Sequence, residues 1–262
     1  MADAGTIIVV GRTDRSRESD AIRRILLRLE AEGYRLHWFE SDYIRSYDRM
    51  TTTIARRWPS LATWGVNDTL VRRLARVTLR LAMIAGDAHR FDHLYVRLFG
   101  QPANNARQLR MLLDATPEGE VHFVTHSAGG ISVTRIADHP SVARIACFGY
   151  PFQRPGNRPE AFRTAHLPSV GKPLMIVQGD TDPYGSDPAE FRRHLPRDAQ
   201  VISLACDHDC DGLSHDEFER AWAAVAGFLR HACEPASANG AGSEVGPPQH
   251  AFLHGGACDI SG

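Results

Sequence analysis

One stretch constrains the fold more than any other: an apolar run that leads into a serine and two glycines. Residues 121–130 read Val-His-Phe-Val-Thr-His-Ser-Ala-Gly-Gly, and a helical segment is predicted over 131–138 directly after them. A strand, a sharp turn that carries a serine and a helix make up the G-x-S-x-G nucleophile elbow. Gly129 supplies the second glycine, whereas Thr125 stands where the first is usual. A serine that only caps a helix is the alternative interpretation.

The remainder of the chain has the composition of a globular protein. Its 262 residues are 43% apolar and 23% charged, which predicts one α/β domain with a sizeable core. The net charge of -1 gives no bulk attraction to nucleic acid, so we expect no nucleic-acid partner. Lys172 is the only lysine among many arginines, which is typical of GC-rich bacterial codon usage.

Cysteine usage and hydropathy predict a cytoplasmic protein. The five cysteines are an odd number and are scattered, which favours free thiols in a reducing compartment. The first residues lack the basic and apolar regions of a signal peptide. No apolar run is long enough for a membrane span, so we expect no stable membrane insertion. The oligomeric state is left open.

Short β-branched strands alternate with amphipathic helices along the chain. Besides the strand from Val121, strands are predicted over 6–10, 34–39, 143–148, 172–177 and 199–205. Helices are predicted over 20–32, 104–113, 131–138, 188–195 and 215–233. This alternation predicts a doubly wound, mostly parallel sheet of about six strands within a domain of residues 1–233. Residues 234–262 are rich in Gly, Ala, Ser and Pro and are expected to form a disordered tail.

Residues 41–101 interrupt this alternation and are expected to form a helical insertion that caps the site. The strongest helix in it is predicted over 68–85, with an apolar stripe and a separate arginine stripe. We expect the apolar stripe to be buried and the arginine stripe to be solvated, because helical periodicity reports burial and not a partner. A basic amphipathic helix that lies on a membrane is the alternative. The apolar stripe is Leu70, Leu74, Val77, Leu81 and Ile84, and the arginines are Arg72, Arg76 and Arg80.

Three residues with the chemistry of acyl transfer follow predicted strands. Ser127, Asp182 and His208 come just after the third, fifth and sixth strands, whose carboxyl ends share one edge of a parallel sheet. A serine needs a base to remove its proton, a histidine can be that base near neutral pH, and a carboxylate can orient the imidazole. The order Ser, Asp, His is that of α/β-hydrolases. His215 is the rival base and Asp180 the rival acid.

Four segments in the second half of the chain resemble those of a known family. The segments 149–156 (Gly-Tyr-Pro-Phe-Gln-Arg-Pro-Gly), 162–168 (Phe-Arg-Thr-Ala-His-Leu-Pro), 172–185 (Lys-Pro-Leu-Met-Ile-Val-Gln-Gly-Asp-Thr-Asp-Pro-Tyr-Gly) and 207–209 (Asp-His-Asp) carry the resemblance. They resemble the α/β-hydrolase superfamily, and more narrowly the short-core group near dienelactone hydrolase, which includes relatives of the testis-expressed hydrolase-like protein. The resemblance does not extend over 41–101.

The resemblance implies a serine hydrolase with an α/β-hydrolase fold that acts on a small acyl substrate and needs no cofactor. By it, Ser127 is the nucleophile, Asp182 the acid and His208 the base. The amide of Ala128, together with that of Arg12 or Thr13, would form the oxyanion hole. Tyr150, Phe152 and Tyr184 are expected to line the substrate pocket. The alternative is a catalytically inactive binding or scaffold protein. Thr125 favours it, and so does the loop after the first strand, which reads Gly-Arg-Thr-Asp over 11–14 where members of the family often have His-Gly or a glycine-rich turn.

The loop after the last strand contains acidic residues, cysteines and histidines of the kinds that bind metals. Residues 207–212 match the start of a D-x-D-x-D-G calcium loop, but Phe218 stands where a bidentate glutamate is required. Cysteines and histidines in the same region lack the usual C-x-x-C pairing of a zinc site. We therefore expect no metal. The zinc set would be Cys206, His208, Cys210 and His215.

Overall fold

The computed structural model describes residues 5–11, 19–62, 69–116 and 119–230. The predicted tail, 234–262, lies outside the described residues, as do Arg12 and Thr13. No helix of the described residues is both long and apolar enough to cross a membrane.

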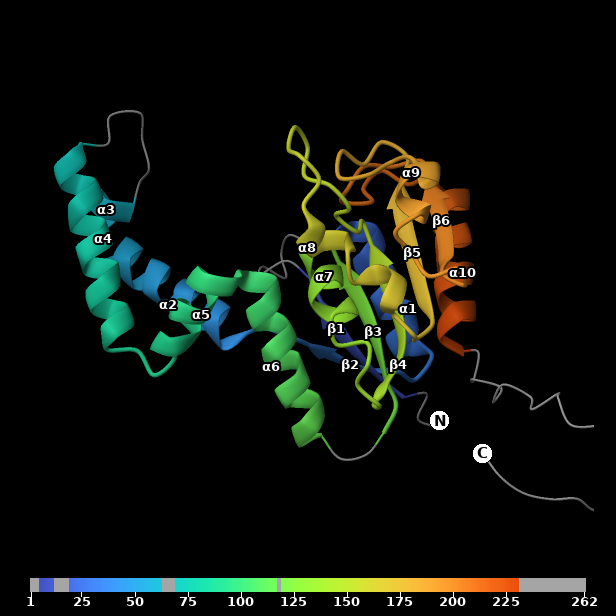
Figure 1. Ribbon diagram of the computed structural model, residues 1–262, viewed down its shortest axis with the longest axis horizontal. Coiled ribbons are helices and arrows are strands. Elements are labelled where there is room, and N and C mark those ends of the chain that lie inside the picture. The colour runs from blue at the N-terminus through green and yellow to red at the C-terminus, as the bar shows by residue number, and fades with distance from the viewer. Residues whose placement is uncertain (1–4, 12–18, 63–68, 117–118, 231–262) are drawn as a thin grey trace, which may run out of the picture. The chain divides into compact units, whose positions relative to one another are not determined.

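A six-stranded parallel sheet forms the centre of the fold (Figure 1). Its strand order is β2-β1-β3-β4-β5-β6, and every neighbouring pair is parallel. The predicted six-stranded, doubly wound sheet is confirmed. The strands are β1 (Thr6–Val10), β2 (Arg35–Trp38), β3 (Val121–His126), β4 (Val142–Phe148), β5 (Leu174–Gly179) and β6 (Gln200–Leu204).

Helices cover both faces of the sheet. Alternate strand residues point to opposite sides, and here the residues on both sides are apolar and need to be buried. On one face, Ile7 and Val9 pack with α1 (Asp20–Ala31) and α10 (His215–Arg230). On the other, Ile8 and Val10 pack with the helices α6 (Gln101–Ala115) and α7 (Ala128–Thr134). Strands buried on both faces explain the continuous apolar runs in the sequence.

Two predicted helices differ in their bounds for local reasons. Helix α7 begins at Ala128, three residues before the predicted start, because the turn at Ser127 leads directly into the helix. Helix α6 begins at Gln101, since Pro102 is compatible with a first helical turn. The remaining short helices after β4 and β5 are α8 (Ala161–Thr164), the 3-10 turn η2 (Leu167–Ser169) and α9 (Pro188–Arg192).

The insertion after β2 is helical, as predicted. It contains α2 (Asp42–Arg57), α3 (Pro59–Ala62), α4 (Leu70–Ala85) and α5 (Arg90–Phe99). Polar contacts join it to α6: the Asp42 amide donates to Gln108 Oε1 at 2.8 Å, and Arg107 pairs with Asp92 of α5. That the insertion caps the site stays a prediction.

The prediction for the two faces of α4 is wrong. Leu70, Leu74 and Leu81 are exposed, whereas Arg76 is buried and donates to the Leu61 carbonyl of α3 at 3.3 Å. The helix therefore contacts its neighbours through part of its arginine-bearing side and leaves its apolar stripe outward. Periodicity located two distinct faces correctly and could not say which one would be covered.

A half-buried histidine, His166, lies beside α7 and next to a positive charge. His166 Nε2 lies 2.8 Å from Thr134 Oγ1 of α7. Burial, reinforced by the positive charge of Arg135, lowers the pKa of His166 to about 4. The unfolded chain, with an ordinary histidine pKa of about 6.5, therefore binds more protons between these two values, so acid favours unfolding.

We predict that the free energy of unfolding contributed by this site is fully present above about pH 6.5 and is lost as pH falls toward about 4. Urea unfolding at neutral and mildly acidic pH measures it. His166→Gln, which keeps an amide donor but cannot titrate, should reduce the pH dependence. The matched control is His215→Gln, at an exposed histidine, which should leave it unchanged. Equal pH dependence in wild type and His166→Gln would contradict the assignment.

Candidate active site

Three of the predicted site residues meet at the carboxyl ends of the strands. His208 Nε2 lies 2.9 Å from Ser127 Oγ, and His208 Nδ1 lies 2.9 Å from Asp182 Oδ2. Asp182 and His208 are both buried, and Ser127 is half-buried. The three side chains thus form one hydrogen-bonded line from a partly accessible hydroxyl to a buried carboxylate.

The backbone at Ser127 has the strained conformation of an elbow. Its φ is 54° and its ψ is -128°, and it is one of two non-glycine residues with positive φ in the described chain. Such a conformation costs about 1–3 kcal/mol and persists only where surrounding structure holds it. Here the Ser127 amide donates to the Phe148 carbonyl at 3.0 Å, and the Gly130 amide donates to the Ser127 carbonyl at 3.0 Å.

Gly129 is required by close packing of the elbow on β1. A Cβ at this position would stand 2.0 Å from the Val10 carbonyl oxygen, closer than any stable contact. Thr125 has no such conflict: it is buried in β3 and pairs in register with Val10 and with Cys147 of the next strand. The elbow therefore forms with threonine in place of the usual first glycine.

Hydrogen bonding determines the tautomer of His208. An ionised carboxylate can only accept, so the bond to Asp182 requires the proton on Nδ1. In the neutral imidazole, Nε2 is then an acceptor for the Ser127 hydroxyl proton. Asp182 is itself held by two more donors: Gln178 Nε2 at 2.7 Å to Oδ2 and the Tyr184 amide at 2.7 Å to Oδ1. This arrangement can orient an imidazole and remove a proton from the serine.

Two glycines let the His208 loop pack directly on the strand ends. A Cβ on Gly149 would lie 2.6 Å from the His208 carbonyl oxygen, and one on Gly179 would lie 2.3 Å from that of Cys206. Thr181 also donates its hydroxyl to the Cys206 carbonyl at 2.7 Å. The loop is therefore positioned by backbone contacts as well as by the side chain of His208.

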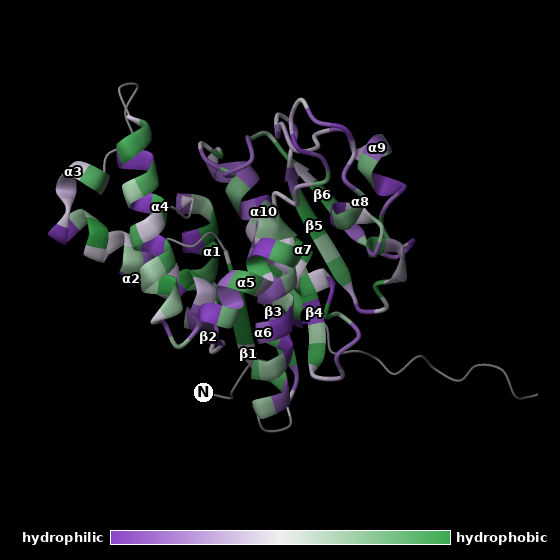
Figure 2. Cartoon of the chain, turned by 60° about the vertical axis from the view of Figure 1, so that its left-hand side comes forward, coloured by the Kyte–Doolittle hydropathy of each residue, from purple (hydrophilic) through white to green (hydrophobic). Residues whose placement is uncertain are grey.

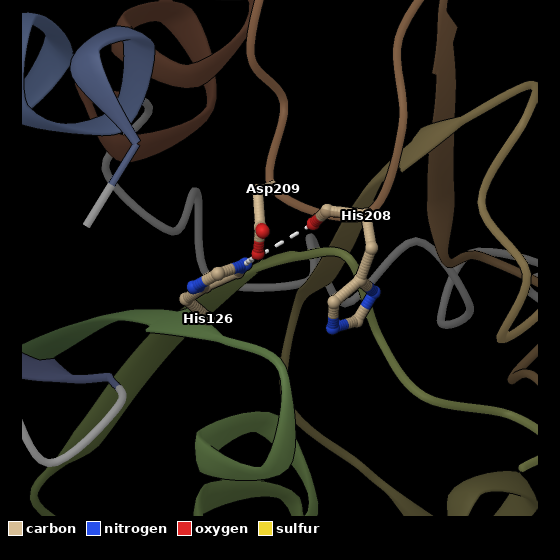
Figure 3. A group of neighbouring side chains, drawn as sticks. All are labelled: His126, His208 and Asp209. Atoms are coloured by element: carbon tan, nitrogen blue, oxygen red, sulfur yellow. Dashed lines mark hydrogen bonds and ion pairs between the residues drawn. The ribbon is translucent and has the colours of Figure 1, made fainter. Parts of the chain in front are cut away.

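His126, which sequence analysis did not single out, holds the same loop from β3. Its Nε2 lies 3.1 Å from the His208 carbonyl oxygen and 3.7 Å from Asp209 Oδ1 (Figure 3). Because a carbonyl can only accept, His126 Nε2 carries the proton and donates. The only sequence signal was its place directly before Ser127. Gln178 was missed in the same way, as a polar residue within an apolar strand.

The predicted pocket aromatics have different environments. Tyr150 is fully buried: its hydroxyl donates to the Arg163 carbonyl at 2.5 Å, and its ring packs against Phe152 at 4.8 Å between centroids. Phe152 is also buried and stacks on Phe191 at 4.6 Å. These two rings pack as core residues and leave little surface for a ligand. Tyr184 is half-buried, and its ring lies 4.5 Å from that of His208.

The rival residues lie elsewhere. Asp180 is exposed at the end of β5, and His215 is exposed at the first position of α10. In contrast, His208 is hydrogen-bonded to Ser127, and Asp182 is hydrogen-bonded to His208. The geometry therefore favours Asp182 and His208 over their rivals.

The predicted oxyanion-hole residues are only partly described. Ala128 is the first residue of α7, and the first amides of a helix have no partner within it. Arg12 and Thr13 lie outside the described residues. The roles of all three amides stay predictions.

The two metal-site alternatives are not assembled in the described part of the chain. Side chains close enough to share a cation there form two groups, His126/His208/Asp209 and Asp42/His89/Asp92, and neither contains a cysteine. A hydrogen bond to Cys206, together with burial, raises the pKa of Cys210. Asp207 Oδ1 accepts the Asp209 amide at 3.0 Å, so the segment that matches the start of a calcium loop uses this carboxylate for its own turn.

Comparison with known proteins identifies a family for the part of the chain that carries Ser127, Asp182 and His208. A family model described as an alpha/beta hydrolase domain matches residues 100–228, which include the elbow and all three residues of the hydrogen-bonded line. The chain belongs to the α/β-hydrolase superfamily. Membership of this superfamily supports the prediction that the protein is a hydrolase. The narrower resemblance to the dienelactone hydrolase group stays a prediction.

Solved structures of a lipase and an esterase domain are similar to this chain. A monoacylglycerol lipase of Paleococcus ferrophilus is 10% identical with a TM-score of 0.52, over 88% of this chain and 95% of the lipase. The esterase domain of a Rhodothermus marinus protein is 16% identical with a TM-score of 0.48, over 88% of each chain. Identities this low concern the fold alone. A search of curated proteins finds no significant match.

Packing at the elbow yields a stability prediction. Gly129→Ala should lower the free energy of unfolding by about 1–3 kcal/mol or more, because the new methyl overlaps the Val10 carbonyl. Gly227→Ala in α10 is the matched control: a Cβ there meets nothing within 4 Å, so alanine should stabilise by about 0.5–1 kcal/mol. Urea unfolding measures both. Equal effects at the two positions would contradict the described packing of α7 on β1.

Proposed function

We propose that this α/β-hydrolase is a serine hydrolase that cleaves an ester, thioester or related acyl bond of a small molecule. The observation that carries the proposal is the position of His208, within 2.9 Å of both Ser127 Oγ and Asp182 Oδ2. An imidazole bonded on one side to a buried carboxylate and on the other to a hydroxyl is the arrangement that activates a serine.

In the proposed first step, Ser127 Oγ attacks the carbonyl carbon of the substrate and its proton passes to His208 Nε2. The tetrahedral intermediate then collapses, the bond to the leaving group breaks, and His208 returns the proton to that group. In the second step, a water molecule gives a proton to His208 and its oxygen attacks the acyl-enzyme. The acid product leaves, and the proton returns to Ser127.

Asp182 has the proposed role of orienting His208 and stabilising the imidazolium formed in both steps. Three donors, from Gln178, Tyr184 and His208, surround its carboxylate and fix its orientation. The Ala128 amide, with that of Arg12 or Thr13, is proposed to stabilise the oxyanion. One such donor is worth about 2.7–4 kcal/mol in the transition state.

The proposed substrate surface begins at Tyr184, whose half-buried ring lies beside His208. Phe152 and Tyr150 lie beneath this surface rather than in its wall. A Cβ on Gly130 would stand 2.8 Å from the Tyr150 ring, so Tyr150 supports α7 and, through it, Ser127. We therefore assign Tyr150 a positioning role in place of the predicted direct contact with substrate.

A fluorophosphonate probe, which reacts covalently with activated serines, tests the nucleophile. Wild type should be labelled, Ser127→Ala should not, and His208→Ala should react slower by about a thousandfold or more, because the hydroxyl loses its base. His215→Ala, at the exposed rival, should be labelled at the wild-type rate.

Failure of labelling in the folded wild type, or labelling that persists in Ser127→Ala, would overturn the proposal. The first result would favour the alternative of a non-catalytic binding protein.

His126 gives a second test, since its side chain is hydrogen-bonded to the backbone of the His208 loop. His126→Leu should lower the labelling rate by about ten- to a hundredfold, as expected for a small displacement of a catalytic group. His126→Gln, whose amide can still donate to the His208 carbonyl, should recover most of that loss. Recovery by glutamine distinguishes the hydrogen bond from simple filling of space. Equal rates in the two variants would exclude the positioning role.

A further inference from the structure

The insertion exposes an unusual amount of apolar surface on two neighbouring helices. Nine of the fourteen large apolar side chains that are exposed in the described chain lie on α4 and α5. Their exposed fractions run from 53% for Leu94 to 75% for Val71. The nine, which we name the α4–α5 face, are Leu70, Val71, Leu74, Val77, Leu81, Phe91, Leu94, Leu98 and Phe99.

These side chains form stripes along each helix. Leu70, Leu74, Val77 and Leu81 recur at intervals of three and four residues, which places them on one side of α4. Phe91, Leu94 and Leu98 do the same on α5. Leu81 and Leu94 line one groove of about 640 Å³ between α2, α4 and α5, so the two stripes converge there. Figure 2 shows apolar positions interleaved with polar ones along α4.

The exposed charged side chains of α4 and α5 are all arginines. Helix α4 contains four arginines and no acidic residue. Helix α5 adds Arg90 and Arg97, and its one carboxylate, Asp92, is buried against Arg107. Arg80 lies over the ring of Tyr47 at 5.5 Å, and Arg90 over that of Phe91 at 5.0 Å, so these cations stand at the edge of apolar surface.

This combination limits what can cover the face. A second copy of the chain would bring arginines against arginines, because a two-fold contact pairs a surface with itself. An anionic lipid surface complements both properties: acyl chains accept the leucine and phenylalanine side chains, and headgroup phosphates pair with the arginines. Long arginine side chains can extend to headgroups while their stems stay on apolar surface.

We propose that the α4–α5 face docks the protein on the surface of an anionic phospholipid membrane. The helices lie in the interface and do not span it. The proposal goes beyond hydrolysis and requires no catalytic step, so Ser127→Ala should bind membranes as wild type does. Failure of the probe to label Ser127 would therefore contradict only the proposed hydrolase activity, and failure to bind vesicles would contradict only the proposed membrane docking.

Co-sedimentation of the full chain with lipid vesicles tests the proposal. We expect binding to vesicles of phosphatidylcholine mixed with phosphatidylglycerol, and weaker binding to phosphatidylcholine alone. Leu74→Asp with Leu81→Asp should reduce the partition constant at least about tenfold, because both carboxylates enter the apolar contact. Arg90→Gln and Arg97→Gln should each weaken binding to the anionic vesicles by about fivefold.

The matched control is Leu27→Asp with Met111→Asp, since Leu27 and Met111 are 56% and 57% exposed, close to the 57% and 60% of Leu74 and Leu81. This control should bind as wild type, and circular dichroism should show that both double variants are folded. Absence of wild-type binding, or equal binding by the two double variants, would overturn the proposal. A wild-type dimer that Leu74→Asp with Leu81→Asp converts to monomer, without vesicle binding, would instead show a contact between copies and would also overturn it.

Discussion

The hydrogen-bonded line from Ser127 to Asp182 depends on how closely two turns pack on the end of the sheet. The elbow approaches β1 so nearly that only a glycine at 129 leaves room for the Val10 carbonyl. The loop that carries His208 also closely approaches the ends of β4 and β5, at Gly149 and Gly179. Distances of 2.9 Å on both sides of one imidazole are reached because close backbone contacts, together with hydrogen bonds from His126 and Thr181, determine where these turns lie.

Much of the sheet could be predicted because its signals are local. Buried parallel strands require continuous β-branched and apolar runs, and those runs appear in the sequence with turns between them. The placement of Ser127, Asp182 and His208 followed from the same reasoning, since each stands directly after such a run. The residues that support them could not be found this way. His126 and Gln178 act through contacts with residues 82 and 4 positions away, and a polar residue inside an apolar run gives no sign of its partner.

The aromatic residues show how a motif can predict a neighbourhood without predicting orientation. Tyr150 and Phe152 follow β4, at the correct edge of the sheet, yet both turn inward and join the core around α7 and α9. Tyr184 stays beside His208 because Asp182 accepts its backbone amide at 2.7 Å. Side-chain direction after a strand depends on the path of the loop, and a proline-rich loop such as that from 151 to 168 has no periodic pattern from which to infer it.

In the insertion, the sequence showed clearly that α4 is a helix with two different faces. It did not show which of these faces would be exposed. Burying a leucine or phenylalanine side chain is worth about 1.5–3 kcal/mol relative to leaving it exposed, so an outward apolar stripe forgoes stability that the same residues could supply. Helix α6 illustrates the usual solution: Leu109 and Leu113 lie at the same spacing and are fully buried against the sheet. Helix α4 instead buries Arg76, whose guanidinium must be hydrogen-bonded to be tolerated. A helix that covers an arginine and exposes five large apolar side chains is poorly explained by folding alone, and is better explained by a surface that removes those side chains from water after the chain has folded.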